Sequence, residues 1–176
     1  GQQGIARWLI VLTFNIDEEF DATPFPELRL HIRRNAKPLG FAENHNAASQ
    51  NALGGLFLIV NPDIRIPKGD VLSQIGELGQ ATGRPTLYAP VVVNPEGQVE
   101  DSVRNNLSPF NLLRRIVARR DGWESDPRQK SFFWLAGMFL IAPLSQYRAL
   151  GGFDQRFRLY CEDYDLSARW RIAGGE

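Results

Sequence analysis

The stretch LFLIVNPD, residues 56–63, joins a short run of apolar residues to an abrupt polar stop. Leu56 to Val60 predicts a buried strand, because a continuous apolar run of this length, bounded by turn signals, suits a strand in a sheet core. Pro62 ends the strand, since proline lacks the backbone donor that a sheet requires. The carboxylate of Asp63 is therefore expected at the rim of the sheet, in a stiffened turn.

Similar apolar runs lie on both sides of this stretch and alternate with helical patterns. The remaining expected strands are Trp8–Phe14, Leu28–Ile32, Thr86–Val93 and Phe132–Ile141. The expected helices are Ala42–Leu53, Asp70–Thr82, Pro109–Ala118, Leu144–Leu150 and Asp163–Ala173. The apolar run Trp8–Phe14 predicts a strand that is buried on both faces, as in a parallel sheet. This alternation predicts an α/β sandwich around a mostly parallel sheet, in which ligands bind at the carboxyl ends of the strands.

The composition indicates one globular domain. The chain has 176 residues, of which 43% are hydrophobic, so it can bury a core. Lys+Arg and Asp+Glu are 20 each, and this balance gives no overall field for nucleic acid or an anionic membrane. No apolar run approaches the roughly 20 residues that a membrane-spanning helix needs. Cys161 is the single cysteine, which excludes an internal disulfide and favours a reducing compartment. Both ends look cut, so we expect residues 1–176 to be one domain that is incomplete at both ends.

Asp63 has two local interpretations. It can cap the turn that follows the strand, or it can meet a hard cation at the sheet rim. Mg²⁺ often binds through one or two carboxylates together with substrate phosphates, so one aspartate in this place is a plausible ligand.

Three acids open the last expected helix: Glu162, Asp163 and Asp165. Acids at a helix N-terminus stabilise the helix dipole, and this alone would account for them. Alternatively, one carboxylate projects into the cleft as a general base, which must lie within hydrogen-bond reach of the hydroxyl that it deprotonates. The helix terminus lowers the pKa of such a base, whereas crowding by neighbouring acids raises it.

The segment NAKPLGFAENHN, residues 35–46, combines a glycine with several amides. Gly40 permits close approach of the backbone to a ligand, and Asn44 and Asn46 offer both donors and acceptors. An ordinary helix N-terminus with surface amides explains the same residues. A basic cluster occurs later in the chain, at Arg114, Arg115, Arg119 and Arg120. Such clusters are more often solvated helix faces, but this one could contact an anionic lipid-linked acceptor or a membrane surface.

The motifs form an ordered set: N-x(4)-G-F-x(4)-N from residue 35, LIVNPD, WLAGMF at 134–139, and GGFDQRFRLYCEDYDLSARWRIAG at 151–174. This set resembles the inverting family 2 glycosyltransferases, in particular the rhamnosyltransferase-like bacterial branch that builds surface polysaccharides. The resemblance runs from Asn35 to the C-terminus. It implies the glycosyltransferase A fold, a Rossmann-like three-layer sandwich, and transfer of a hexose with inversion.

The resemblance also implies roles for individual residues. Asp63 matches the last aspartate of the family's metal-binding Asp-x-Asp, which here reads Asn61-Pro62-Asp63. Asp163 matches the catalytic base, with Glu162 and Asp165 in support. The remaining residues match the substrate-binding segments of the family: Asn35, Gly40, Asn46, Asn61, Trp134, Ala136 and Gly137.

The implied cofactor is Mg²⁺ or Mn²⁺. The implied partners are a nucleotide-diphosphate sugar as donor and a saccharide or lipid-linked saccharide as acceptor, without nucleic acid. A cytoplasmic protein with peripheral membrane contact is expected. Two other classes stay open, namely a nucleotidyltransferase of similar fold and a non-catalytic sugar-nucleotide-binding domain. A glycoside hydrolase could also use paired carboxylates, but it does not require a metal-diphosphate site.

Overall fold

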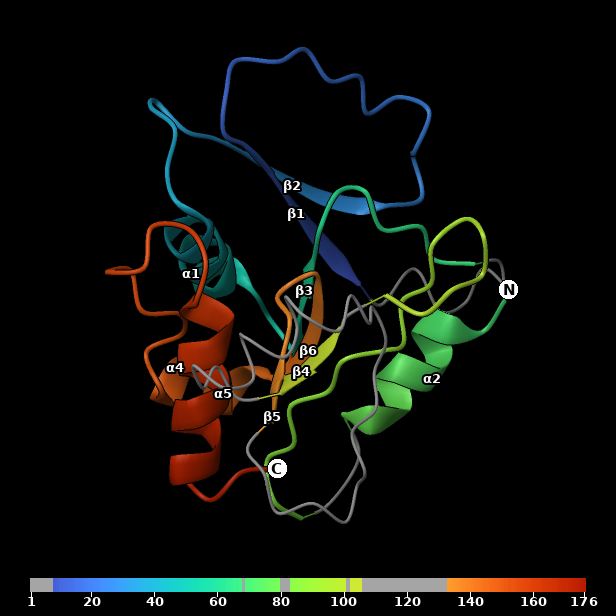
Figure 1. Ribbon diagram of the computed structural model, residues 1–176. Helices are drawn as coiled ribbons and strands as arrows, with labels where there is room; N and C mark the ends of the chain where they lie inside the picture. The colour runs from blue at the N-terminus through green and yellow to red at the C-terminus, as the bar shows by residue number, and fades with distance from the viewer. Residues whose placement is uncertain (1–7, 68, 80–82, 101, 106–132) are drawn as a thin grey trace.

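The computed structural model describes residues 8–67, 69–79, 83–100, 102–105 and 133–176 (Figure 1). Strand β1 (Leu9–Phe14) pairs with β2 (Arg29–Arg34) in parallel register, from Leu9 opposite Arg29 to Phe14 opposite Arg34. The Asn35 backbone N–H donates to the Phe14 carbonyl at 3.0 Å, so the pairing extends one residue beyond β2. The carboxyl ends of both strands therefore meet at the same edge.

The centre of the fold is an antiparallel pair. Strand β3 (Leu56–Val60) has the bounds that its sequence predicts, and it pairs with β6 (Phe139–Pro143). Side chains of β6 alternate between two hydrophobic clusters: Leu140 and Ala142 face one, and Phe139 and Ile141 face the other. This alternation is the period of two that a pleated strand imposes, and it shows that both faces of the pair are covered.

Four helices of the described residues lie on the two sides of this central pair. Their bounds are Phe41–Asn51 for α1, Val71–Leu78 for α2, Leu144–Ala149 for α4 and Glu162–Ile172 for α5. Figure 1 shows α1, α4 and α5 on one side of β3 and β6, with α2 on the other. The expected layered α/β arrangement is therefore present. The predicted helix Pro109–Ala118 and the arginine cluster beside it lie outside the described residues.

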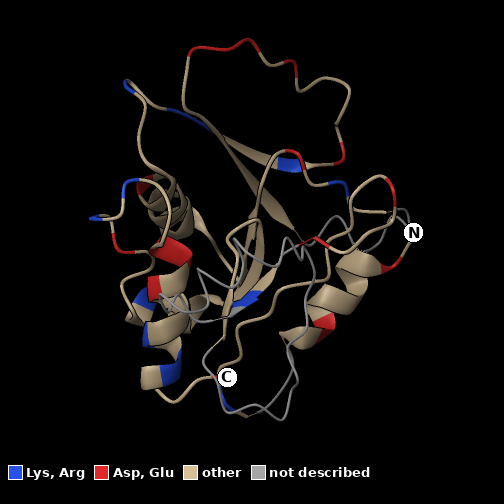
Figure 2. Cartoon of the chain, viewed as in Figure 1, with Lys and Arg blue, Asp and Glu red and all other residues tan. Residues whose placement is uncertain are grey.

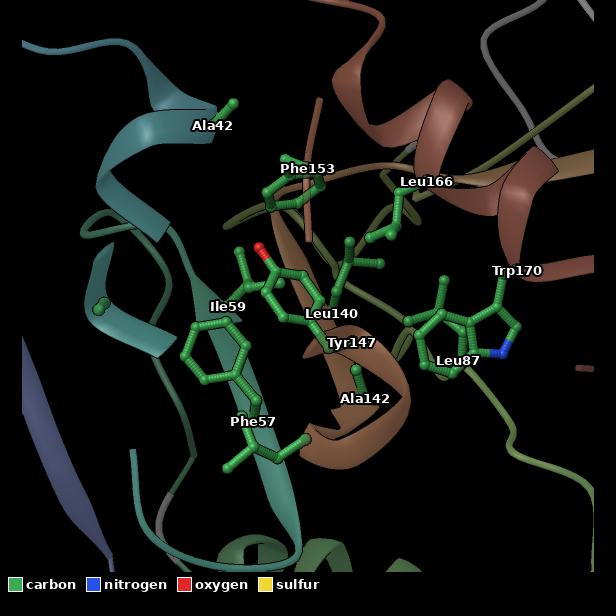
Figure 3. Packing of buried hydrophobic residues seen from close by; sticks show 12 residues of the cluster. Ala42, Phe57, Ile59, Leu87, Leu140, Ala142, Tyr147, Phe153, Leu166 and Trp170 are labelled. Atoms are coloured by element: carbon green, nitrogen blue, oxygen red, sulfur yellow. The ribbon is translucent and has the colours of Figure 1, made fainter. Parts of the chain in front are cut away.

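The larger cluster contains the biggest fully buried side chains of the described chain (Figure 3). They are Trp170, Tyr147, Phe153, Ile59, Leu140 and Leu166. Leu166 and Trp170 come from one face of α5, as their spacing predicts, and the Trp170 indole N–H donates to the Pro85 carbonyl at 2.9 Å. Ala173, directly after the end of α5, is exposed. The buried face of α5 thus ends at Trp170, so the core holds mainly its N-terminal two-thirds.

Several sequence predictions about strands are wrong. The sheet is not mostly parallel, because two of the three described strand pairs, β3 with β6 and β4 with β5, are antiparallel. Trp8–Phe14 is not buried on both faces, since Ile10 is 38% exposed. The run Thr86–Val93 forms only isolated bridges, from Tyr88 to Ile141 and from Val93 to Val99.

The expected strand Phe132–Ile141 is two strands. Its first part is β5 (Phe133–Leu135), which pairs with β4 (Val103–Asn105), and its second part is β6. The intervening residues 136–138 form a turn. This turn carries the site described below. Among the described residues, no helix is long and apolar enough to cross a membrane.

Candidate active site

The antiparallel pairing of β3 with β6 determines where Asp63 lies. Val60, the last residue of β3, is opposite Phe139, the first residue of β6. The Asn61 N–H donates to the Met138 carbonyl at 3.0 Å, and the Ile64 N–H donates to the Asn61 carbonyl at 3.1 Å. The turn that holds Asp63 is therefore attached to the turn between β5 and β6, and Asp63 itself is exposed.

Asp163 approaches the same β5–β6 turn from α5. Its Oδ2 accepts the Gly137 N–H at 2.9 Å, and its Oδ1 accepts the Tyr164 N–H at 2.9 Å. A Cβ at residue 137 would lie 3.3 Å from the Phe41 ring and 3.6 Å from the Asp163 Cβ. Glycine at this position therefore lets the turn pack between α1 and α5, and the two hydrogen bonds orient the half-buried Asp163 carboxylate.

A short path of hydrogen bonds thus brings the two predicted acids to one edge of the sheet. Asp163 is bonded to Gly137, and the next residue, Met138, is bonded to Asn61, two residues before Asp63. The end of the path at Asp63 follows strand β3, and the end at Asp163 is the first turn of α5. Two carboxylates that are 100 positions apart in the chain are therefore linked through the β5–β6 turn.

Glu162 is almost fully buried, at 6% exposure. Among the described residues its Oε2 has no hydrogen-bond partner. Burial, together with the nearby Asp163 charge, raises the pKa of the Glu162 carboxyl. The two preceding residues, Tyr160 and Cys161, both have a φ of 70°, a left-handed conformation that costs energy for residues other than glycine. The backbone is thus strained at the point where it delivers the acids to α5.

Asp165 forms an ion pair with Arg169, with 2.5 Å between Arg169 Nη2 and Asp165 Oδ2. Arg169 also donates to the carbonyls of Leu150 and Gly152, each at 2.8 Å. Asp165 therefore orients an arginine that holds the loop after α4. The structure gives it this positioning contact rather than a contact with the Asp163 carboxylate.

Asn46 anchors the same loop from α1. Its Oδ1 accepts the Tyr147 hydroxyl at 2.7 Å and the Phe153 N–H at 2.9 Å, and its Nδ2 donates to the Phe153 carbonyl at 2.7 Å. A Cβ at Gly152, where φ is +68°, would lie 2.2 Å from Asn46 Oδ1. These bonds account for most of the hydrogen-bonding capacity of Asn46, so it acts on the site through the loop.

Asn35 belongs to a network of three amides where β1, β2 and α1 meet. Its Nδ2 donates to Asn15 Oδ1 at 3.0 Å and to Asn44 Oδ1 at 2.7 Å. Asn15 Oδ1 also accepts the Leu39 N–H at 2.8 Å. The network fixes the segment that leads to Gly40. Sequence analysis noted the donor and acceptor groups of Asn44 but did not select Asn15, whose signal was its position directly after a strand.

Gly40 lies beside an open cleft of about 740 Å³. Its N–H donates to Glu43 Oε2 at 3.0 Å, which caps α1. A Cβ at Gly40 would lie 2.9 Å from the Arg158 carbonyl, so glycine allows the loop before α5 to approach α1. The cleft is lined by Asn15, Leu39, Gly40, Phe41, Asn44 and residues 156–160. Sequence reasoning missed the contribution of residues 156–160.

Trp134 and Ala136 support the site from beneath. Trp134 is 4% exposed, and its ring meets Tyr164 of α5 edge to face at a centroid separation of 5.9 Å. The Arg104 guanidinium lies 5.1 Å from the Trp134 ring centroid. The Ala136 N–H donates to the Ser102 carbonyl at 2.8 Å. Trp134 therefore packs the residues before the β5–β6 turn against α5, Ala136 bonds the turn to Ser102 before β4, and neither residue lines the cleft.

Asp63 is the residue that could hold a cation. Within the described ranges no group of three or more histidine, cysteine, aspartate or glutamate side chains is arranged to bind a metal. A metal enclosed by protein ligands alone is therefore not built from these residues. One exposed carboxylate does suit a hard cation that takes its other ligands from water and substrate phosphates.

Comparison with known proteins adds relatives to this geometry. No protein-family model matches the chain. The N-acetylglucosaminyl-diphospho-decaprenol L-rhamnosyltransferase of Mycobacterium tuberculosis is 27% identical over 128 residues, which cover 66% of this chain and 41% of that protein. Rhamnosyltransferase WbbL of Escherichia coli is 44% identical over 41 residues, covering 23% of this chain and 16% of that protein. The chain is a distant homologue of bacterial rhamnosyltransferases. It spans less than half the length of these curated relatives.

The fold of this rhamnosyltransferase homologue is found in a solved structure. The mannosyltransferase PcManGT from Pyrobaculum calidifontis, in complex with GDP-Man and Mn²⁺, matches with a TM-score of 0.52 and 20% identity. The match covers 87% of this chain and 39% of that one. It supports the expected glycosyltransferase A fold, although the described strands form three separate pairs rather than one continuous sheet.

Proposed function

We propose that the chain transfers a sugar from a nucleotide-sugar donor to an acceptor hydroxyl, with inversion at the anomeric carbon. The observation that carries this proposal is the approach of Asp63 and Asp163 to one sheet edge through Gly137, Met138 and Asn61. The distant homology to bacterial rhamnosyltransferases supports the same reaction class. A deoxyhexose donor and a role in surface polysaccharide assembly follow from that homology.

Asp163 is the proposed base. Each of its oxygens accepts one backbone N–H, which orients the carboxylate and leaves further lone pairs for a substrate hydroxyl. The carboxylate takes the hydroxyl proton while the acceptor oxygen bonds to the anomeric carbon. The bond between that carbon and the diphosphate oxygen breaks in the same step. Attack from the face opposite the leaving group inverts the configuration, by the logic of inverting glycosidases.

Asp63 is the proposed ligand for Mg²⁺ or Mn²⁺ at the donor diphosphate. A divalent cation there would offset the negative charge that develops on the departing diphosphate. Asn61 holds the turn against Met138 and so keeps Asp63 at the sheet edge. Support comes from the exposure of Asp63 and from its place directly after β3.

The donor is proposed to occupy the cleft beside Gly40. Asn15 and Asn44 line it directly, whereas Asn35 and Asn46 maintain its walls through hydrogen bonds. Gly137 gives the approaching sugar a close, flat contact beside Asp163, and Trp134 with Ala136 stiffens that turn. Glu162 is proposed to support Asp163, because its buried carboxyl anchors the first turn of α5 directly before the base.

The acceptor is proposed to be a saccharide linked to a lipid through a diphosphate. The printed name of the mycobacterial relative describes an acceptor of this kind for that protein. Peripheral membrane contact would then follow from the acceptor.

The test is donor turnover in the full protein. Nucleoside diphosphate release from dTDP-, UDP- and GDP-sugars is measured with and without Mn²⁺, in the presence of a lipid-linked acceptor. Metal-dependent release that yields an inverted product supports the proposal, and Asp163→Asn serves as the matched control. Donor binding without release under these conditions would favour the non-catalytic binding domain. Release of diphosphate from a nucleoside triphosphate would favour the nucleotidyltransferase.

A further inference from the structure

The loop directly before α5, residues 156–160, forms one wall of the cleft. Figure 2 shows basic residues on this loop and acidic residues at the start of α5. The cleft is lined by arginines, amides and apolar groups, and its lining contains no carboxylate. The cleft next to the proposed base therefore has a wall that is suited to an anion.

The two arginines of this loop differ in their contacts. Arg156 is paired with Asp154 at 2.6 Å, in an exposed ion pair of the kind that contributes little to stability. Arg158 is exposed, and among the described residues its side chain has neither a hydrogen bond nor an ion pair. Its backbone is fixed nonetheless, because its carbonyl lies against Gly40. A free guanidinium on a fixed backbone is well suited to bidentate recognition of phosphate oxygens.

Two large apolar side chains follow Arg158 directly. Leu159 is 62% exposed and Tyr160 is 76% exposed, and both line the cleft. Tyr160 is also the first of the two residues in the left-handed conformation, so the backbone is strained where this apolar pair faces solvent. Apolar exposure next to an unpaired cation matches a ligand that carries a phosphate on an apolar chain.

We propose that residues 158–160 bind the diphosphate and the first apolar units of the lipid-linked acceptor, with Arg158 on the phosphates and Leu159 and Tyr160 on the lipid. This inference rests on the proposed function, since it names the part of the acceptor that this loop recognises. The loop precedes Asp163 by only a few residues, so this assignment places the acceptor next to the segment that carries the proposed base. The nucleoside of the donor then lies on the side of the same cleft formed by Asn15, Gly40 and Asn44, and the donor diphosphate is bound at Asp63.

Farnesyl diphosphate, inorganic diphosphate and a nucleoside diphosphate with Mn²⁺ are the probes, each titrated by calorimetry against the full protein. Arg158→Ala is expected to weaken farnesyl diphosphate binding about tenfold, a loss of about 1.4 kcal/mol, and to leave nucleoside diphosphate binding within about twofold. Leu159→Ser should weaken farnesyl diphosphate but leave inorganic diphosphate unchanged. Arg29→Ala is the matched control, because Arg29 is exposed and lies at the start of β2, away from the end that leads to Gly40. It should change the binding of neither farnesyl diphosphate nor inorganic diphosphate.

The proposal is overturned if the unaltered protein does not bind farnesyl diphosphate, or if Arg158→Ala leaves that binding unchanged. Equal weakening of the nucleoside diphosphate would assign the loop to the donor instead. Phosphatidylglycerol vesicles are tested as competitors of farnesyl diphosphate. If they bind the loop equally well, the loop belongs to a membrane surface, and this result also overturns the proposal. These results are separable from the proposed function: sugar transfer that is insensitive to Arg158 refutes the loop assignment alone, and Arg158-dependent binding without transfer refutes the reaction alone.

Discussion

The Asp163 carboxylate and the backbone N–H of Gly137 are joined by a hydrogen bond of 2.9 Å. This bond links the first turn of α5 to the turn between β5 and β6, and the next residue of that turn is bonded to Asn61. The position of the proposed base is therefore coupled to the position of the proposed cation ligand. A change at either end of this path is expected to affect the other.

Asp163→Asn is expected to abolish sugar transfer and to preserve donor binding. The amide oxygen can still accept the Gly137 N–H, although the amide NH₂ cannot accept the Tyr164 N–H, and an amide cannot take a proton. General base catalysis contributes about 10²–10⁴-fold, so turnover should fall by at least that factor. Single-turnover kinetics and donor titration measure the two effects. Normal turnover in this variant would refute the base assignment, and Asp21→Asn, at an exposed turn, is the control.

Asp63→Ala is expected to remove the Mn²⁺ dependence of donor binding. The side chain is exposed, so its loss should leave the melting temperature almost unchanged while donor affinity with Mn²⁺ falls to the value without Mn²⁺. Calorimetric titration with and without the ion checks this. Donor affinity that still rises with Mn²⁺ would mean that other residues hold the cation.

Arg169→Met is expected to destabilise the protein by about 2–3 kcal/mol, because two loop carbonyls and Asp165 lose their donor. Asp165→Asn should cost less, about 1 kcal/mol, since an amide oxygen can still accept from Arg169. Urea unfolding gives both values. Arg84→Met, in an exposed pair with Glu176, is the control and should change stability by less than about 1 kcal/mol. Equal effects at residues 84 and 169 would contradict the network.

His45 should make stability depend on pH. Burial against Phe41 and Phe153 lowers the pKa of His45 to about 4, from its ordinary 6.5. The unfolded chain therefore binds a proton between pH 6.5 and 4 that the folded chain excludes, and the free energy of unfolding falls as the pH drops through this window. His45→Phe should remove about 1–3 kcal/mol of that fall. Urea unfolding at pH 7 and pH 4.5 measures it, and equal slopes in both proteins would refute the effect.

Sequence predicted the elements whose signals are local. The strand Leu56–Val60 and the helices that carry Asn46 and Asp163 are close to their expected bounds, because apolar runs, glycines and acidic first turns act within a few residues. The run Thr86–Val93 has strand composition, yet its partners decide its structure: the Leu87 N–H bonds to the carbonyl of Glu176, and Tyr88 bridges to Ile141. Such distant pairings leave no mark in a single sequence.

The site divides in the same way. Its acids stand beside signals that a sequence shows directly: a proline after β3 for Asp63, and the acidic first turn of α5 for Asp163. The contacts of Asn46 could not be foreseen, since its partners in the loop after α4 lie more than one hundred residues away in sequence. The role of Asp165 depends on the same loop, which it reaches through Arg169. The sequence did not predict the turn at residues 136–138, because the residues on both sides of it are apolar and resemble one continuous strand.

The close approach of Gly152 to Asn46 constrains how this protein can vary. A side chain at 152 would occupy the space of the Asn46 amide and would have to adopt a left-handed backbone. A shorter residue at 46 would clear that space but would release both polar groups of Phe153. Any tolerated exchange at one position therefore requires a compensating exchange at the other, so in a deep mutational scan these two sites should show strong epistasis although they lie on different segments.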